Sequence, residues 1–290
     1  MTKAIKPYDT HPIKPGFAMP PDACDAHCHV FGPAARFPYA EDRTYTPPDA
    51  GKETLRRLHD HLGISRAVIV HPSCHGNDLA VTLDAIATSD GRYRGVATIK
   101  GDVTDRELET LHRGGIRALR FNFVAHLGGA PELDLFDALV GRMKAFGWHV
   151  VLHLDADDIL TYSDRLDRMP VPFVIDHMGR VRADRGLDQP AFTRLLELMK
   201  NPLAWVKICG AERVSGTGKR PFHDAVPLAR ALIEAAPDRI LWGTDFPHPN
   251  ISKDMPNDGE LVDLIPQFTP VAALQRTILV DNPTRLYWST

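Results

Sequence analysis

Two histidines separated by one residue, His27 and His29, follow a short apolar run near the start of the chain. In a β-strand, residues i and i+2 point to the same face, so the two imidazoles should share one side of a strand. Histidine is the commonest protein ligand of metal ions and the usual proton carrier near neutral pH. The pair alone is weak evidence for either role. It gains weight because later apolar runs end in His153, His177 and Asp245.

The elements that must position these residues form a regular alternation of apolar runs and helical patterns. Short apolar runs predict strands at residues 23–30, 66–71, 95–99, 118–123, 149–154, 173–176, 204–209 and 240–243. Helical periodicity follows at residues 52–62, 78–89, 105–113, 133–146, 157–168, 189–200, 221–236 and 270–279. Continuous apolar runs are typical of buried parallel strands. Eight such βα units predict an α/β fold, a (β/α)8 barrel, with a doubly wound sheet as the alternative.

Length and composition narrow the class of protein. The 290 residues contain no low-complexity linker, which favours one barrel domain over residues 1–290 with residues 1–21 as an extended N-terminal arm. A hydrophobic content of 43% is that of an ordinary globular protein, and a net charge of -3 argues against a nucleic-acid partner. No apolar run reaches the ~20 residues of a transmembrane helix, and the N-terminus lacks the apolar core of a secretory signal. We therefore expect neither a nucleic-acid nor a membrane partner, and the pattern does not define an oligomeric state.

The four cysteines, Cys24, Cys28, Cys74 and Cys209, form no C-x-x-C pair. Reduced thiols are the simplest expectation for such a chain, and they favour a cytoplasmic location. Cys28 or Cys74 could act as a nucleophile, but the ordinary role of a free cysteine is that of a small buried residue.

Polar residues gather where the predicted strands end, which is where a barrel carries its active site. A single histidine or aspartate at such a position is usually a loop-capping residue. Recurrence at the ends of the first, fifth, sixth and eighth strands makes coincidence a poor explanation. Neutral imidazoles with one carboxylate suit Zn²⁺. The same groups could instead polarise a carbonyl directly, with the carboxylate as base. The candidate ligands are His27, His29, His153, His177 and Asp245.

Several segments resemble the amidohydrolase superfamily, and within it the 2-pyrone-4,6-dicarboxylate lactonases and 4-sulfomuconolactone hydrolases. The resemblance covers nearly the whole chain, and the combination is more specific for the group than for the substrate. The matching segments are Asp25–Gly32, Ser73–Gly76, Arg120–Phe123, Asp176–Arg180, Trp242–Asn250 and Asn282–Trp288.

The resemblance implies a distorted (β/α)8 barrel and the hydrolysis of small anionic lactones from aromatic-compound catabolism, a carboxylic ester hydrolase activity. By position, His27, His29 and His177 would surround the lactone carbonyl. Asp245 would be the general base, and His177 would be the second catalytic residue. The acidic substituents of the substrate would be held by Arg120, Arg180 and Arg213, with Tyr45, Ser73, His75 and Asn250 as further contacts.

Two departures from the lactonase pattern bear on the substrate and the metal. The pyrone-dicarboxylate lactonases resembled here carry a second arginine shortly after the equivalent of Arg120, where this sequence has His126. They carry a tyrosine where this sequence has His153. The first change removes a bidentate carboxylate clamp, for which histidine is a poor substitute. The second restores a histidine that metal-binding amidohydrolases use as a ligand.

These features give an order of expected functions. We expect one Zn²⁺ or similar divalent metal, with a metal-free mechanism left open. The first expected reaction converts 4-sulfomuconolactone to maleylacetate and sulfite, and the alternative is hydrolysis of 2-pyrone-4,6-dicarboxylate. More remote alternatives are an amidohydrolase-type decarboxylase, a lactone isomerase and a non-catalytic binding protein.

Overall fold

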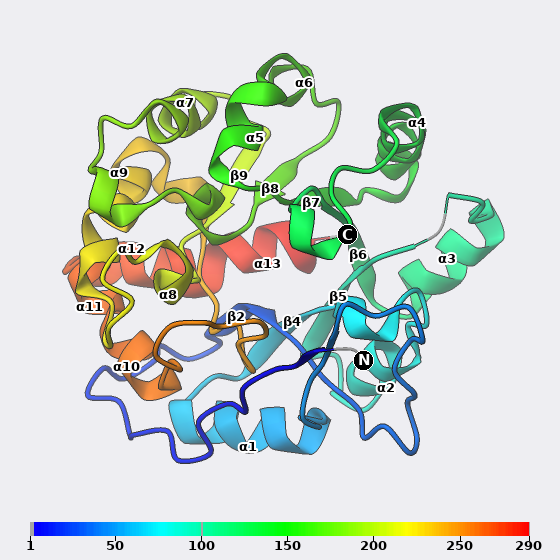
Figure 1. The fold of residues 1–290 in the computed structure, drawn as a ribbon, viewed down its shortest axis with the longest axis horizontal. Coiled ribbons are helices and arrows are strands. Elements are labelled where there is room, and N and C mark those ends of the chain that lie inside the picture. The colour runs from blue at the N-terminus through cyan, green and yellow to red at the C-terminus, as the bar shows by residue number, and fades with distance from the viewer. Residues whose placement is uncertain (1–2, 100, 290) are drawn as a thin grey trace.

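The computed structural model describes residues 3–99 and 101–289 and contains the predicted ring of eight parallel strands (Figure 1). Each strand pairs with the next one along the chain, which is the order of a (β/α)8 barrel and excludes a doubly wound sheet. The strands are β2 (Cys24–Cys28), β4 (Arg66–Val70), β5 (Tyr93–Ala97), β6 (Ile116–Asn122), β7 (His149–His153), β8 (Phe173–Ile175), β9 (Ala204–Lys207) and β10 (Ile240–Leu241).

Backbone hydrogen bonds between the first and last strand regions close the ring. The amide of Ala26 donates to the carbonyl of Trp242 at 2.9 Å. Beyond it, the amide of Asp245 donates to the carbonyl of His27 at 2.7 Å, and that of His29 to the carbonyl of Phe246 at 2.8 Å. Main-chain hydrogen bonds therefore hold together two of the predicted site segments, 27–29 and 245.

Helices surround the ring, and most begin and end near the predicted positions. α1 and α3 have the predicted bounds, and α3 starts with a capping box in which Thr104 and Glu107 exchange hydrogen bonds. The helix predicted over 157–168 is wrong in detail, because α5 and α6 are separate and meet at Tyr162. The short helices α8, α10, α11 and α13 were not predicted. The bounds are α1 (Lys52–Leu62), α2 (Ala80–Ala87), α3 (Asp105–Arg113), α4 (Leu133–Met143), α5 (Ala156–Thr161), α6 (Ser163–Asp167), α7 (Pro190–Leu198), α8 (Ala211–Val214), α9 (Val226–Ala235), α10 (Asp258–Asp263), α11 (Ile265–Phe268), α12 (Ala272–Arg276) and α13 (Asn282–Tyr287).

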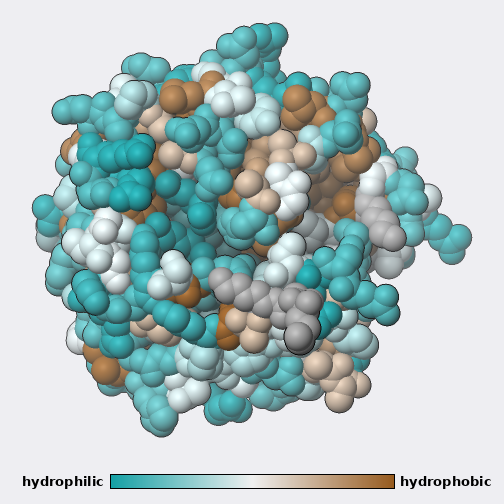
Figure 2. Space-filling view, viewed as in Figure 1, coloured by the Kyte–Doolittle hydropathy of each residue, from teal (hydrophilic) through white to brown (hydrophobic). Residues whose placement is uncertain are grey.

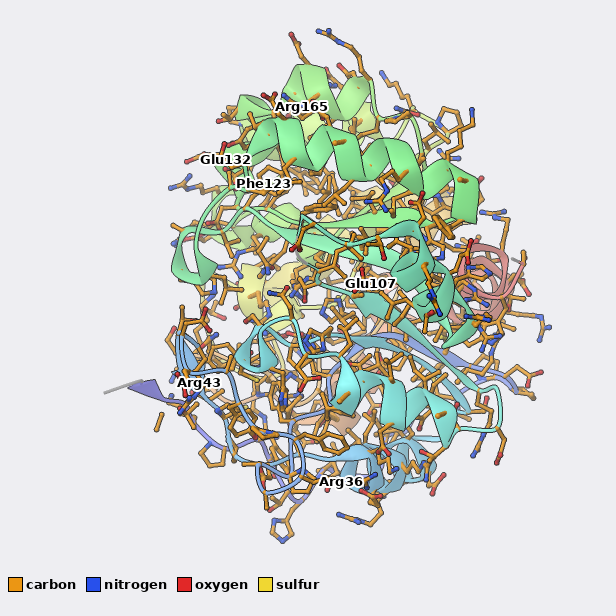
Figure 3. The ribbon with its side chains drawn as sticks, turned by 90° about the vertical axis from the view of Figure 1, so that its right-hand side faces the viewer. Arg36, Arg43, Glu107, Phe123, Glu132 and Arg165 are labelled. Carbon is orange, nitrogen blue, oxygen red and sulfur yellow. The ribbon has the colours of Figure 1, made fainter. Side chains whose placement is uncertain are left out.

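Apolar side chains fill both sides of the ring. Small and branched residues such as Ala26, Val70 and Val96 pack inside it together with Tyr287 of α13, so the barrel interior is a core and not a pore. A larger cluster fills the space between strands and helices. In that layer lies Phe123, just after β6 (Figure 3). Its ring centroid is 5.8 Å from that of Phe136 in α4 and 5.0 Å from that of Tyr162.

The N-terminal arm runs over the outside of the barrel. It begins with β1 (Lys3–Ala4), which pairs in parallel with β3 (Tyr45–Thr46). Further along, the amides of Ile13 and Phe17 donate to the side chains of Asn257 and Asp263 at 3.0 and 2.8 Å. The face seen in Figure 2 is largely hydrophilic with scattered apolar residues. Within the described ranges, no helix combines the length and apolarity that crossing a bilayer requires.

A β-bulge in β2 aims two histidines at the barrel interior. Asp25 pairs with Ala67 and Cys28 with Ile69, so β2 has one more residue than β4 over this stretch. Ala26, before the extra residue, packs in the inner core, whereas Cys28 packs in the outer one. His27 and His29 consequently lie on the inner side, as the i, i+2 rule predicts.

The bulge requires a glycine opposite it, and this gives a first prediction. A Cβ at Gly243 would lie 2.5 Å from the His27 nitrogen and 2.8 Å from Asp25 Oδ1, so Gly243→Ala should push the first and last strands apart. We expect a loss of roughly 1–3 kcal/mol in the free energy of unfolding, measured in urea, as for other overpacked cores. Gly141→Ala is the matched control, because nothing lies within 4 Å of its added Cβ in α4 and alanine favours a helix by up to about 1 kcal/mol. Equal effects of the two substitutions would contradict the close approach of β2 and β10.

Candidate active site

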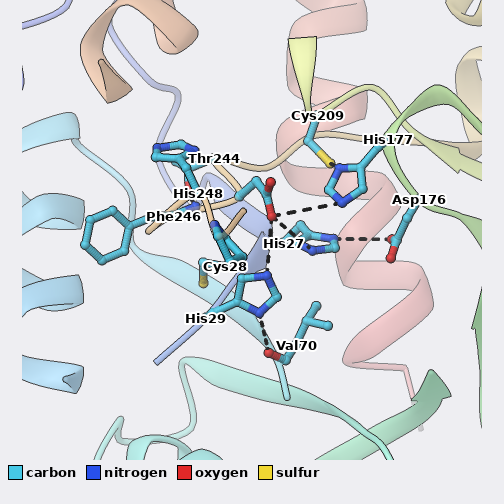
Figure 4. Close-up of polar contacts among 12 residues, drawn as sticks. His27, Cys28, His29, Val70, Asp176, His177, Cys209, Thr244, Phe246 and His248 are labelled. Carbon is cyan, nitrogen blue, oxygen red and sulfur yellow. Dashed lines mark hydrogen bonds and ion pairs between the residues drawn. The ribbon is translucent and has the colours of Figure 1, made fainter. Parts of the chain in front are cut away.

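The centre of the site is one carboxylate oxygen surrounded by imidazole nitrogens (Figure 4). Asp245 Oδ1 lies 3.3 Å from Nε2 of His29, 3.5 Å from Nε2 of His27 and 4.0 Å from Nε2 of His177. All four side chains are almost fully buried. The structure thus brings together residues from β2, the end of β8 and the end of β10, as the sequence predicts.

The other oxygen of this carboxylate is held by an arginine. Arg213, in α8, donates to Asp245 Oδ2 from Nε at 2.6 Å and also from Nη2, and both of its Nη atoms donate to the carbonyl of Pro249 at 3.2 Å. Burial alone would raise the pKa of Asp245, but the Arg213 guanidinium and the histidines hold that pKa well below its usual range. Asp245 is therefore a carboxylate at neutral pH.

Two histidines of the site are oriented by hydrogen bonds from Nδ1. His29 Nδ1 lies 2.7 Å from the carbonyl of Val70, and His153 Nδ1 lies 3.1 Å from Oδ1 of Asn122. A carbonyl or amide oxygen only accepts, so each Nδ1 carries a proton and each Nε2 is directed at the site. Among the described residues, the buried Nε2 of His153 has no hydrogen-bond partner, and burial holds the pKa of this imidazole well below its usual value, so its Nε2 carries an unshared pair.

His27 is tied from behind to a buried group of charges. Its Nδ1 lies 3.0 Å from Lys207 Nζ and 3.3 Å from Asp176 Oδ1, and these two charges lie 3.1 Å apart. Arg120 Nε and Nη2 both reach Asp176 Oδ2 at 3.1 Å. Burial, followed by the Lys207 charge, lowers the pKa of His27 to about 4, so this imidazole is neutral near pH 7. A proton donated to Asp176 would leave Nε2 of His27 as an acceptor, whereas a bond accepted from Lys207 would make Nε2 a donor.

Most of the predicted substrate contacts line one small pocket above these groups. The pocket is bounded by His29, Tyr45, Ser73, Arg120, His126, His153, His177, Arg213, Asp245 and Asn250, together with Pro72, Leu127 and Pro249. His27 lies beneath it, fully buried.

His75 and Arg180 do not belong to this lining. His75 directs its ring nitrogens at backbone groups, the amide of Gly32 at 3.2 Å and the carbonyl of Pro38 at 3.0 Å. Arg180 Nε donates to Asp155 at 2.7 Å. Their contacts with a substrate remain predictions.

Left-handed backbone conformations gather around the site. Among the described residues, nine other than glycine have positive φ, and six of these lie in the segments 177–180 and 245–250. They include His177 at 53° and Asp245 at 63°. Such conformations cost of order 1 kcal/mol each or more, and they are typical of functional sites.

The site depends on residues to which the sequence pattern assigns no role. Asp176 and Lys207 are two of them, although a lysine inside the apolar strand β9 is itself an unusual signal. Cys209 Sγ lies 3.3 Å from His177 Nδ1, and Thr244 precedes the central aspartate. Only the fold brings these contacts together.

The donor atoms of the site satisfy the first requirement for a metal ion. His27, His29 and Asp245 each offer a ligand atom, and these atoms lie within 4.8 Å of one another. The same holds for His27, Asp176 and His177. Nε2 of His27 and Oδ1 of Asp245 are buried and have no hydrogen-bond partner in the part of the chain that the structure describes, which is unfavourable unless another group completes the site. Within the described residues, His153 joins no such group, although its ring lies 5.5 Å from that of His177.

Buried neutral histidines away from the pocket predict how stability depends on pH. Burial lowers the pKa of His71 and of His149 to about 3 from an ordinary 6.5. The unfolded chain therefore binds more protons below pH 6.5, and stability present above that pH is lost as pH falls towards 3. We expect the free energy of unfolding to drop by roughly 2 kcal/mol per such histidine between pH 7 and 5, while values at pH 7 and 8 should agree. Urea titrations that gave the same stability at pH 7 and 5 would contradict the neutral burial of these groups.

Comparison with known proteins agrees with this geometry. The Amidohydrolase family model matches residues 24–288. The chain is 46% identical to a 2-pyrone-4,6-dicarboxylate hydrolase of Comamonas testosteroni over 96% of this chain and 94% of that protein. It is 44% identical to a 4-sulfomuconolactone hydrolase of Hydrogenophaga intermedia, over 96% and 92% respectively. A crystal structure of an Agrobacterium tumefaciens protein superposes with a TM-score of 0.84 at 30% identity, covering 95% of this chain and 99% of that one. The chain belongs to the amidohydrolase family.

Proposed function

We propose that this protein opens the ring of a small lactone that carries two acidic groups, hydrolysing its carboxylic ester bond. One observation carries the proposal. The Asp245 oxygen that has no hydrogen-bond partner among the described residues faces the imidazoles of His27, His29 and His177, at the floor of a pocket that Arg120 and Arg213 line. That arrangement places a proton acceptor, imidazoles that can polarise a carbonyl and positively charged side chains around one cavity. Both curated relatives described above are named as hydrolases, of a pyrone dicarboxylate and of a sulfonated muconolactone.

The residues divide the chemistry between them. Water attacks the lactone carbonyl, and Asp245 accepts the proton at Oδ1. His177 donates a hydrogen bond from Nε2 to the carbonyl oxygen and stabilises the charge that develops on it, because the Cys209 thiol, 3.3 Å from His177 Nδ1, leaves the ring proton on Nε2. Collapse of the tetrahedral intermediate breaks the ring C–O bond, and the ring oxygen leaves as an enolate.

The low pKa of Asp245 has a consequence for this step. A strongly depressed pKa keeps the base ionised but makes it a weak proton acceptor. The attacking water must therefore be acidified by its surroundings. A bound divalent cation supplies this chemistry, because it polarises the carbonyl and lowers the pKa of water towards ~7.

We propose one Zn²⁺, or a similar divalent ion, held by residues from the set His27, His29, His153, His177 and Asp245. Neutral imidazoles with one carboxylate are the donor set that zinc prefers. The metal-free alternative assigns a different role to His27, in which Nε2 carries the proton and donates to the carbonyl oxygen. The contact of Lys207 with His27 Nδ1 at 3.0 Å favours that tautomer, so metal content distinguishes the two mechanisms.

The substrate proposed first is 4-sulfomuconolactone, with 2-pyrone-4,6-dicarboxylate as the alternative. Arg213 is occupied by Asp245 and Pro249, whereas Arg120 contacts Asp176 through Nε and Nη2, and its Nη1, which has no hydrogen bond to another described residue, would bind an anion. His126 and His153, which distinguish this chain from the pyrone pattern, both line the pocket. After ring opening, the sulfonated product would lose sulfite and leave maleylacetate.

We also propose that residues 1–290 act as one domain, since the arm pairs with β3 and contacts Asn257 and Asp263. The four cysteines are buried free thiols, which suits a reaction in the reducing cytoplasm.

The test of this function is turnover of both lactones by the wild type and by Asp245→Asn. We expect hydrolysis of at least one lactone, with a fall in kcat of at least ~100-fold in the variant, the usual size of a general-base effect. Asp137→Asn is the matched control, because this exposed aspartate of α4 pairs with Arg165 away from the pocket. Wild-type turnover by Asp245→Asn would show that the base is misassigned.

Metal analysis of the same purified sample separates the two mechanisms. The metal-dependent mechanism predicts about one zinc ion per chain. It also predicts that activity is lost when a chelator removes the metal and returns when zinc is added. Full activity in a preparation free of divalent metals would instead support direct polarisation by the histidines.

A further inference from the structure

We propose that Asp25 is a positioning residue that fixes the distance between the histidines of β2 and the base Asp245. The proposal rests on the function proposed above. Asp25 is fully buried and is not among the residues that line the pocket, so it can act only through the groups it holds.

The Asp25 carboxylate accepts four hydrogen bonds from three segments of the chain. Oδ1 accepts from the amides of His27 and Thr244, each at 3.0 Å. Oδ2 accepts from the hydroxyl of Thr244 at 2.6 Å and lies 3.2 Å from Nε2 of His59 in α1. One side chain therefore bonds to the residue before the base and to the first histidine of the His-x-His pair.

The hydroxyl of Thr244 forms hydrogen bonds to the residues on either side of this contact and thereby links Asp25 to the segment that carries Asp245. Its hydroxyl donates to Asp25 and accepts from the amide of Phe246 at 3.0 Å, so it spans Asp245 on both sides. The amide of Asp245 itself donates to the carbonyl of His27. These bonds hold Asp245 in its left-handed conformation, at a φ of 63°.

The bulge in β2 makes this carboxylate necessary. The extra residue between Asp25 and Cys28 removes the amide of His27 from the regular ladder. A buried amide without a partner is costly, and Asp25 supplies that partner. The same carboxylate thus stabilises the bulge that aims His27 and His29 inward and binds the loop that carries Asp245.

A cation site is the competing interpretation, because ligand atoms of Asp25, Cys28 and His59 lie within 4.8 Å of one another. The contacts argue against it. Both Asp25 oxygens are occupied by donors, and the Cys28 thiol donates to the carbonyl of Val68 at 3.6 Å. Burial raises the pKa of Cys28 well above its usual value, so no thiolate is available as a ligand.

The experiment removes one hydroxyl while keeping the shape of its side chain. Thr244→Val should lower kcat at least ~10-fold with KM changed less than ~3-fold, and Thr244→Ser should restore kcat to within ~3-fold of wild type. In the Asp245→Asn background, Thr244→Val should change the residual rate by less than ~2-fold, because the residue acts through the base. Asp25→Asn, which removes one acceptor oxygen, should behave like Thr244→Val.

Two further measurements separate positioning from stability and from the proposed function. Thermal unfolding should show that Thr244→Val is folded at the assay temperature. In Thr244→Val, the rate of amide hydrogen exchange should rise in segments 25–29 and 243–248 and stay unchanged in α3. This measurement does not depend on which lactone the protein hydrolyses. Wild-type kcat for Thr244→Val, an equal fold-loss in both backgrounds, or unchanged exchange in these segments would overturn the role of Asp25. Failure to hydrolyse either lactone together with the expected exchange pattern would overturn only the proposed function.

Discussion

The structure depends on the contact between the first and last strands of the barrel. The ring closes where the main chain of 26–29 meets that of 242–246, and the closest approach occurs at Gly243, which has no side chain. The same contact places His27 and His29 beside Asp245. Closing the barrel and assembling the site are therefore one structural event, since any separation of these strands would part the base from the imidazoles.

Burial of charge sets the chemical state of the groups that this contact brings together. Asp245 is paired with Arg213, and Asp176 with Lys207 and Arg120; the side chains are buried, except that of Arg213, which is slightly exposed. A buried charge is tolerated only when it is paired and hydrogen-bonded. These pairs keep both aspartates ionised, while desolvation keeps His27, His153 and His177 neutral. The result is a carboxylate that can accept a proton beside imidazoles that can bind a cation or face a carbonyl.

Much of this arrangement could be predicted from the sequence. Apolar runs defined all eight strands, because buried parallel strands need continuous apolar residues, and polar residues at their ends located His27, His29, His177 and Asp245. The bulge and the contacts of Asp25 could not be predicted, since the bonds to Thr244 join residues 219 positions apart. Local pattern also could not show that His75 turns to backbone groups or that Arg213 binds Asp245. Those outcomes depend on which neighbours the closed barrel supplies.

In the proposed reaction, water that is activated beside Asp245 attacks a lactone carbonyl. The most direct test is a single turnover in H₂¹⁸O, followed by mass spectrometry of the ring-opened product. Hydrolysis predicts one ¹⁸O atom in the newly formed carboxylate, with a rate of incorporation that falls in Asp245→Asn. Product formed without ¹⁸O would contradict water attack and would favour an isomerase that only moves a proton on the same scaffold.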